Sequence, residues 1–431
     1  MNNNPLIYHG EWWVPAVADY DTRMNFIEPK QMMGYETKYT GTLTYYGDKD
    51  SILELYHVPS NFHSKHYCQN EVIWGKDANG HVFTLFNVMM QVQRTGNFSC
   101  TRFVVAYILI GEHVLSAYDN CFGSCIVHFP YLRNWAFHDN IIQSNSGTLV
   151  SFKSPMFAEK LLEALHEEGI FWRIWQGQTI QRTIYDLTIT QTTTLEIEAI
   201  KGLSILSYMR NIEEFAQFLS IALYCEQNPS EIKFVNKENK HESCFLIKKD
   251  VSVDSGVTTL IKFGILKDKL PTMLNTWHKN FEKMAPISSY LIDSLQRINR
   301  FDVPDFLIIA QALDGYHKRF VNKRDGKDHQ KYEDGIRILI SQFDDVDCIQ
   351  KCHINPTVLT QSRDKYSHLL KDQDKPLAVE GEDLYWLTEK CKILLTCCIL
   401  NMLGLTNKEI NLCCDNSPIS QIIESFPPEF D

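Results

Sequence analysis

The chain has 431 residues, of which 44% are hydrophobic and 22% charged, ordinary values for a globular protein of two or three domains. Its longest apolar stretches, such as 103–110 and 393–403, are too short to cross a bilayer, so we expect no membrane span. The formal net charge of −11 argues against a protein that coats nucleic acid non-specifically, although it is compatible with a local basic site.

The N-terminus and the cysteines predict a cytoplasmic protein. The opening MNNNPLIYHGEWW has no basic segment followed by an apolar core, so we expect no signal peptide. Thirteen cysteines, with adjacent pairs at 397–398 and 413–414, do not resemble a disulfide framework. We expect reduced thiols that mostly pack as small apolar groups.

Residues 1–285 are expected to form a β-rich module, and a division of this module near residue 200 is left open. Segments rich in Thr, Tyr, Val, Phe and Ile alternate with turn signals such as 47–48 and 78–80, a spacing that predicts a sandwich or barrel. Helices are expected at 156–166 and 205–225. The expected strands are 39–46, 51–58, 81–88, 101–110, 147–152, 187–199, 231–235, 243–248 and 258–264.

Residues 286–431 are expected to form an all-α bundle, which makes the overall fold class α+β. Asp302 and Pro304 are residue types typical of a helix N-cap and first turn, and Asn355 with Pro356 opens another helix in the same way. Gly404 is expected to end the longest helix. The expected helices are 289–299, 304–320, 331–343, 355–371 and 382–403.

Arg363 and His368 are five residues apart, and the polar Asp364 follows the arginine. This is the pattern of ribonuclease domains of the HEPN type, but the pattern is weak without structural context. Two further matches are Arg133-Asn134…His138 and Arg324-Asp325…His329. The first lies in the strand-rich half and the second in a charged loop that contains a glycine. Only Arg363 falls within a capped helix that has an apolar face.

The helix that carries Arg363 is expected to have a polar face and an apolar face. At about 100° per residue, Asp364 and His368 lie together, nearly opposite the apolar side. A polar pair turned away from its own core suits a cleft shared with a second subunit. The residues expected on the apolar face are Val358, Leu359, Ser362, Tyr366, Leu369 and Leu370.

Residues from about 288 to the C-terminus resemble the HEPN domain of the ApeA family of bacterial anti-phage proteins. The segment 306–317, FLIIAQALDGYH, is similar to that family's Gln-Ala-Leu-Glu-x-Tyr-His, with Asp314 in place of Glu. The segment 361–368, QSRDKYSH, is similar to its Thr-Arg-Asn-Tyr-x-Thr-His, with Asp364 in place of Asn. Residues 394–410 resemble its last helix and tail, and the opening GEWWVP resembles the N-terminal domain found with it.

The resemblance implies a homodimer that cleaves RNA through the HEPN domain without a metal or other cofactor. A histidine can serve as base or acid near neutral pH, and an arginine can bind phosphate with two parallel hydrogen bonds. The expected products are a 2′,3′-cyclic phosphate and a 5′-hydroxyl. The expected catalytic residues are Arg363, His368 and Asp364. Residues expected to support the site or bind substrate are Asp314, Gln311, Tyr366, Lys318 and Arg319.

The expected partners are RNA, a second copy of the chain, and a phage protein or other trigger at the β-rich module. A dense basic run either lines the entrance to the cleft or is a solvated loop. This run consists of His317, Lys318, Arg319, Lys323, Arg324, Lys327, His329 and Lys331. The alternative function is a non-catalytic dimeric binding or sensor protein with a degenerate HEPN scaffold. Which RNA would be cut, and what would trigger cleavage, are left open.

Two clusters of metal-ligand residue types occur in the β-rich module. One consists of His63, His66 and Cys68, and the other of Cys121, Cys125 and His128. Neither has the spacing of a paired zinc knuckle. On a strand, Cys121 and Cys125 would lie on one face and His128 would point away. Whether either cluster binds a metal is left open.

Overall fold

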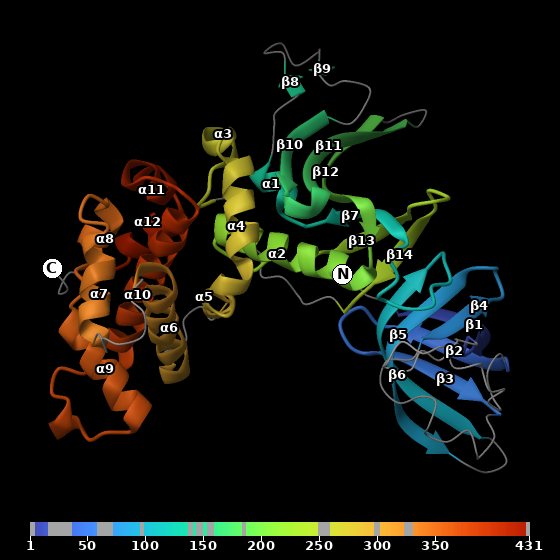
Figure 1. Cartoon of the computed structure of the whole chain (residues 1–431), viewed down its shortest axis with the longest axis horizontal. Helices are drawn as coiled ribbons and strands as arrows, with labels where there is room; N and C mark the ends of the chain where they lie inside the picture. Colours follow the sequence, from blue (N-terminus) through green and yellow to red (C-terminus); the bar gives the residue numbers. More distant parts are fainter. Residues whose placement is uncertain are drawn as a thin grey trace. The chain divides into compact units, whose positions relative to one another are not determined.

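A computed structural model of the chain divides into two compact units (Figure 1). The first contains Met1–Pro130, Glu167–Ile212 and Asn228–Val251; the second contains Tyr131–His166, Glu213–Gln227 and Ser252–Asp431. The domain boundary expected at residue 285 stays a prediction. The structure describes residues 5–15, 37–57, 72–94, 99–136, 141–143, 150–152, 159–182, 187–248, 259–296, 302–322 and 331–427.

The first unit contains a closed antiparallel barrel, drawn in blue in Figure 1. Its strands follow the order β6-β3-β2-β1-β4-β5, and β5 pairs back with β6, so the ring has no free edge. A Cβ on Gly75 would lie 2.2 Å from the Trp12 ring, so glycine lets this fully buried indole fill the core. The strands are β1 (Leu6–Trp13), β2 (Tyr39–Tyr45), β3 (Ser51–Tyr56), β4 (Ile73–Asp77), β5 (Val82–Arg94) and β6 (Cys100–Ile110).

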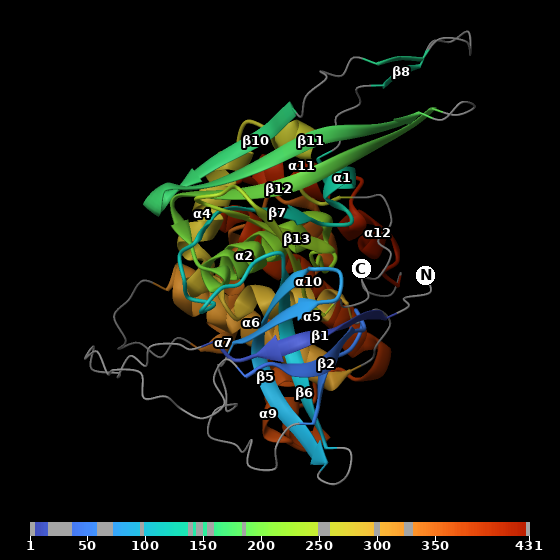
Figure 2. The ribbon, with the colours of Figure 1, turned by 90° about the vertical axis from the view of Figure 1, so that its right-hand side faces the viewer.

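The sheet continues beyond the barrel because β6 is long enough to pair with two strands along one edge. Residues 100–105 pair with β3, and residues 108–110 pair with β14 (Glu242–Leu246). The order then runs through β13 (Glu231–Asn236), β7 (Phe122–His128), β12 (Leu187–Leu203) and β11 (Ile170–Arg182). The last two form a long antiparallel ribbon (Figure 2). The α+β fold class is confirmed, and the expected sandwich or barrel is a barrel with a sheet extension.

Two expected elements are wrong. Residues 159–166 form strand β10 (Glu159–His166) instead of a helix, and β10 packs against α4 (Leu270–Met284). The segment consists largely of strong helix formers, but Leu162, Ala164 and His166 alternate as buried residues of a strand, so tertiary packing overrides local propensity. No strand forms at 259–264. There, the N–H groups of Leu260 and Ile261 both bind the Ala222 carbonyl, and a short helix follows.

Shorter elements complete the chain between the barrel and the helical region. Helix α2 (Ile205–Leu223) confirms the helix expected from residue 205. Residues 141–143 and 150–152 pair as a two-stranded hairpin, β8 (Ile141–Gln143) with β9 (Val150–Phe152). The short helices are α1 (Leu132–Trp135), α3 (Phe263–Leu266) and the 3₁₀ turn Glu167–Gly169.

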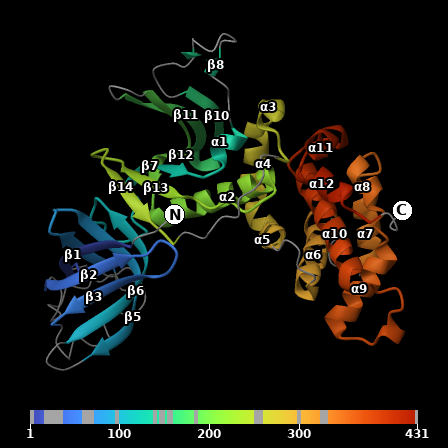
Figure 3. The same cartoon turned by 180° about the vertical axis from the view of Figure 1, so that it is seen from behind.

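The described residues of the second unit between 287 and 427 form helices and their connections, with no strand among them, as expected from the sequence (Figure 3). Helix α10 (Gly381–Met402) is its centre, since every residue from 387 to 400 is buried and the helix packs against α5, α6, α7, α8 and α11. The others are α5 (Ile287–Leu295), α6 (Val303–Tyr316), the π-helical turn His317–Val321, α7 (Tyr332–Ser341), α8 (Asp347–Cys352), α9 (Pro356–His368), the 3₁₀ turn Asp372–Asp374, α11 (Asn407–Cys414) and α12 (Pro418–Glu424).

The buried part of α10 includes a charged side chain, that of Lys392. The Lys392 side chain is 3% exposed. Its ammonium lies 2.8 Å from Glu389 and 3.4 Å from Asp305 of α6, and it donates to the Ser294 carbonyl of α5. Opposite charges and a carbonyl therefore compensate its loss of hydration, and the network joins α5, α6 and α10. No helix among the described residues is long and apolar enough to cross a membrane.

Candidate active site

Helix α9 carries the motif, and its two ends are set by local interactions. The Asn355 side chain accepts hydrogen bonds from the N–H groups of Thr357 and Val358, and Pro356 occupies the first turn. His368 is the last helical residue because Leu369 adopts a left-handed conformation with φ 51°. The Leu370 N–H then binds the Lys365 carbonyl at 2.9 Å. The helix thus ends directly after the motif.

Arg363 is held between two neighbours. Its guanidinium lies 5.1 Å from the centre of the Tyr332 ring, and it donates to Asp364 Oδ1 at 3.1 Å. Its side chain is 33% exposed, so part of the guanidinium remains accessible to a ligand. An aromatic face and a carboxylate together restrict the orientation of the planar cation.

Asp364 lies between two cations. Lys375 Nζ is 2.9 Å from Oδ2, on the other side of the carboxylate from Arg363. Burial by itself would raise the pKa of Asp364, but the hydrogen bonds from Lys375 and Arg363 outweigh burial and hold its pKa below the usual range. The three side chains together carry one net positive charge, which favours an anionic ligand.

The segment 375–380 folds back along α9 and thereby positions Lys375. The Leu377 N–H binds Gln361 Oε1 at 3.0 Å, and the Val379 N–H binds Ser362 Oγ at 3.0 Å. The Tyr366 hydroxyl donates to the Val379 carbonyl at 2.9 Å. The predicted site residue Tyr366 therefore anchors this segment, and its ring meets Phe306 of α6 edge-on.

Lys365, inside the motif, also fastens this segment. It forms ion pairs with Asp372 and Glu380, and its side chain is only 9% exposed. Hydrogen bonds to Asp372 and then Glu380 raise its pKa above the ordinary lysine value. Its ammonium is thus already paired with two carboxylates.

His368 is exposed at the C-terminal end of α9. No hydrogen bond or ion pair joins its ring to another residue in the described part of the chain.

The apolar face expected for α9 is partly wrong: Leu359 and Ser362 are buried, but Leu369 is 89% exposed. A helical wheel extended through residue 370 places Leu369 incorrectly, because the left-handed residue breaks the periodicity.

The predicted residues of α6 and the π-helical turn differ in their surroundings. Asp314 forms an ion pair with Lys318 at 2.7 Å, and Gln311 is exposed. Arg319 donates to the carbonyls of Lys283 and Ala285 at the end of α4. The predicted phosphate-binding residue Arg319 therefore has a structural contact of its own.

Tyr332 connects Asp314 with the motif. Its hydroxyl donates to the Ala310 carbonyl of α6 at 3.1 Å. Burial raises its pKa well above the ordinary value, the charges of Asp314 and Asp364 raise it further, and Arg363 lowers it. Asp314, Asp364 and Arg363 thus all lie close enough to influence this phenol. Helices α6, α7 and α9 pack against one another around it.

The remaining sequence candidates lie elsewhere. Arg133 is on the four-residue helix α1, whereas its partner His138 lies outside the described residues, as do Arg324 and His329. Lys323, Lys327, His63, His66 and Cys68 also lie outside them.

The cluster of Cys121, Cys125 and His128 does not converge. Cys125 is fully buried on β7, and His128 at the end of the strand lies 3.9 Å from Glu231. Burial, with smaller contributions from the carboxylates of Glu112 and Asp119, raises the pKa of the Cys121 thiol to about 11. Within the described ranges, one group of three metal-ligand side chains has its ligand atoms within 4.8 Å of one another, and it is a different group.

Comparison with known families identifies both parts of the chain. The model of ApeA N-terminal domain 1 matches residues 7–277, and the model of the ApeA-like HEPN domain matches residues 307–409. The first match alone covers more than half of the chain. The chain belongs to the ApeA family. Comparisons with curated proteins and with solved structures found no match.

Sequence reasoning missed two residues of the candidate site, and both lie in the region that matches the ApeA-like HEPN domain. Lys375 follows α9 in a charged segment, and Tyr332 opens α7 directly after the basic run. Neither belongs to the Arg…His motif. Their only local signal is proximity to charged segments, which many surface residues share.

Proposed function

We propose that this ApeA-family protein is a cytoplasmic, metal-independent endoribonuclease of bacterial anti-phage defence. The observation that carries the proposal is the arrangement around Asp364. Arg363 and Lys375 flank this carboxylate at 3.1 and 2.9 Å, and His368 ends the same helix. Two cations and an accessible imidazole are the groups that metal-free RNA cleavage requires.

In the proposed reaction, the ribose 2′-oxygen attacks the adjacent phosphorus while the bond from phosphorus to the 5′-oxygen breaks. A base removes the 2′-hydroxyl proton, and an acid donates a proton to the departing 5′-oxygen. His368 fills one of these two roles, and His368 of the second copy in the proposed homodimer fills the other. Arg363 and Lys375 stabilise the charge of the pentacoordinate phosphorane. The products are a 2′,3′-cyclic phosphate and a 5′-hydroxyl.

Asp364 serves this chemistry indirectly. Because it accepts from both Arg363 and Lys375, it fixes the distance between the two cations and leaves one net positive charge. A local positive site is needed because the chain as a whole carries a net charge of −11. Asp364 is thus proposed as a positioning residue.

The active form is proposed to be a homodimer through the HEPN domain. His368 is exposed, and an acid–base residue needs a partly desolvated site. Leu369, next to it, is 89% exposed, and Leu377, which is fastened to α9 through Gln361, is 49% exposed. A second copy related by a two-fold axis would cover these leucines and bring both copies of His368 to one cleft.

The N-terminal module is proposed to sense infection, with a phage protein or another phage-derived signal as its trigger. The match to ApeA N-terminal domain 1 over residues 7–277 supports a regulatory module distinct from the HEPN domain. Control of the nuclease by this module would keep it inactive in uninfected cells.

The deciding experiment is cleavage of RNA by the purified full-length chain in EDTA. We expect cleavage by the trigger-activated wild type, with cyclic phosphate ends, and none by His368→Ala or Arg363→Ala under the same conditions. His138→Ala and His329→Ala, from the competing motif matches, are the controls and should cleave normally. Equal activity of His368→Ala and wild type would remove the assignment. No cleavage by a folded, trigger-activated wild type would favour the non-catalytic dimeric sensor instead.

A further inference from the structure

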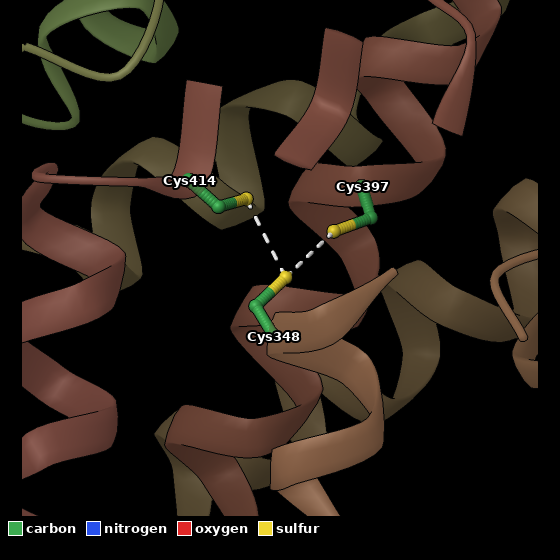
Figure 4. Close-up of side chains that lie close together, drawn as sticks. All are labelled: Cys348, Cys397 and Cys414. Carbon is green, nitrogen blue, oxygen red and sulfur yellow. Dashed lines mark hydrogen bonds between the residues drawn. The ribbon is translucent and has the colours of Figure 1, made fainter. Parts of the chain in front are cut away.

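Three cysteine thiols meet inside the helical region (Figure 4). Cys348 lies in the first turn of α8, Cys397 in the second half of α10, and Cys414 at the end of α11. The Cys348 sulfur lies 3.4 Å from that of Cys414 and 3.7 Å from that of Cys397. All three sulfurs lie within 4.8 Å of one another, and the three residues are at most 4% exposed.

Abundance of cysteine does not explain this convergence. Cys352, Cys391, Cys398 and Cys413 are also buried on these same three helices. None of them belongs to a group of three ligand atoms in the part of the chain that the structure describes. The three converging thiols are distinguished by position alone, and they come from three separate helices.

We propose that Cys348, Cys397 and Cys414 bind one soft d¹⁰ metal ion, Zn²⁺ or Cu⁺, through three thiolates. A tetrahedral zinc ion with bonds of about 2.3 Å to sulfur places its sulfurs about 3.8 Å apart. The distances of 3.4 and 3.7 Å are already close to that value. An ion therefore needs only small side-chain shifts to enter between them.

The donor set selects the class of ion. All three donors are sulfur, and the group contains no carboxylate or imidazole. Mg²⁺ and Ca²⁺ prefer oxygen ligands, whereas thiolates prefer Zn²⁺ and Cu⁺. Three thiolates suit a three-coordinate Cu⁺, or a Zn²⁺ that takes a fourth ligand from outside this group.

Uptake of a metal ion by three thiols depends on pH. Only the thiolate form binds the ion, so the cation must displace the thiol protons. Binding should therefore weaken as the pH falls.

The proposed ion has a structural role. It would join α8, α10 and α11, and none of its ligands lies on α9, which carries Arg363 and His368. Because metal binding to a folded site is linked to folding, occupancy should raise the Tm. The proposal is independent of the nuclease proposal, since its readouts are metal content and Tm.

The test is the metal content of the full-length chain, purified under anaerobic reducing conditions and reconstituted separately with Zn²⁺ and with buffered Cu⁺. We expect about one ion per chain in the wild type for at least one metal, and its loss in Cys348→Ser and Cys414→Ser. Cys398→Ser, a buried cysteine of α10 outside the group, is the matched control and should retain the ion. Comparison of the two reconstitutions identifies the metal.

Three results would overturn the proposal. The first is a reduced, folded wild type that takes up neither Zn²⁺ nor Cu⁺. The second is normal metal content in folded Cys348→Ser and Cys414→Ser. The third is a Cys348–Cys414 disulfide in the native protein, seen by mass spectrometry, with no uptake of metal after reduction. If the serine variants fail to fold, which far-UV circular dichroism would reveal, the wild-type measurement alone decides.

Discussion

The Arg363 guanidinium lies 5.1 Å from the centre of the Tyr332 ring, so the first residue of α7 orients the motif arginine of α9. The same guanidinium also donates a hydrogen bond to Asp364 Oδ1, at 3.1 Å. The geometry of the candidate site thus depends on contacts from outside the motif.

Replacement of Tyr332 should show how much RNA cleavage depends on the orientation of the Arg363 guanidinium. Tyr332→Leu removes the aromatic face, and we expect kcat for RNA cleavage to fall about 10- to 100-fold because the guanidinium loses its fixed orientation. Tyr332→Phe keeps the ring and loses only the hydrogen bond to Ala310, so its kcat should stay near that of the wild type. Equal losses in the two variants would contradict a role for the ring.

Lys375→Met should weaken RNA binding through charge. Loss of one phosphate-binding cation should reduce the slope of log K against log salt concentration by about one. Binding titrations at several salt concentrations measure this slope. Lys351→Met removes an equal charge from an exposed residue of α8 and should leave the slope unchanged. If both variants shift it alike, Lys375 contributes only to the overall charge.

Two substitutions of Leu369 test its backbone conformation and its exposed side chain separately. Leu369→Gly relieves the strain of a left-handed leucine and should stabilise the fold by about 1 kcal/mol, which a rise in Tm would show. Leu369→Asp places a charge on the 89% exposed position, and the proposed dimer should dissociate. Light scattering measures the mass. An unchanged dimer in Leu369→Asp would move the interface elsewhere.

Acid stability should depend on His166 of β10. Burial, with a smaller contribution from the neighbouring His278, lowers its pKa from 6.5 to about 3. Between these values the unfolded chain binds the proton and the folded chain does not, so stability rises with pH. We expect the free energy of unfolding to fall by at most about 1.4 kcal/mol per unit as pH drops below 6.5. His166→Phe should flatten this dependence, measured by denaturant unfolding.

Treatment with a chelator should show whether RNA cleavage and the stability of the helical region respond differently to metal removal. RNA cleavage should persist in EDTA for as long as the helical region stays folded, because the proposed reaction uses side chains and the 2′-hydroxyl alone. Activity and Tm are therefore measured in the same samples. A loss of cleavage at unchanged Tm would contradict the metal-free reaction. A loss of both together would instead indicate removal of an ion from the Cys348 site.

Much of the architecture could be predicted because its signals are local. Helix periodicity and the Asn355 cap predict α9, and strand-type segments separated by turns predict the β-rich module. The Arg363…His368 spacing, in its helix, indicated the candidate site. Local signals failed at 159–166, where helix-forming residues form a strand, and at Leu369, where one left-handed residue ends the helical periodicity.

Only the tertiary structure decided which distant residues meet. Closure of the barrel depends on the pairing of β5 with β6, in addition to the pairing of β6 with β3. Lys375 reaches Asp364 because the segment after α9 turns back along it, and the three thiols converge only when α8, α10 and α11 pack. Sequence periodicity shows which face of an element is buried. The partner of that face depends on the packing of the whole unit, which one segment does not encode.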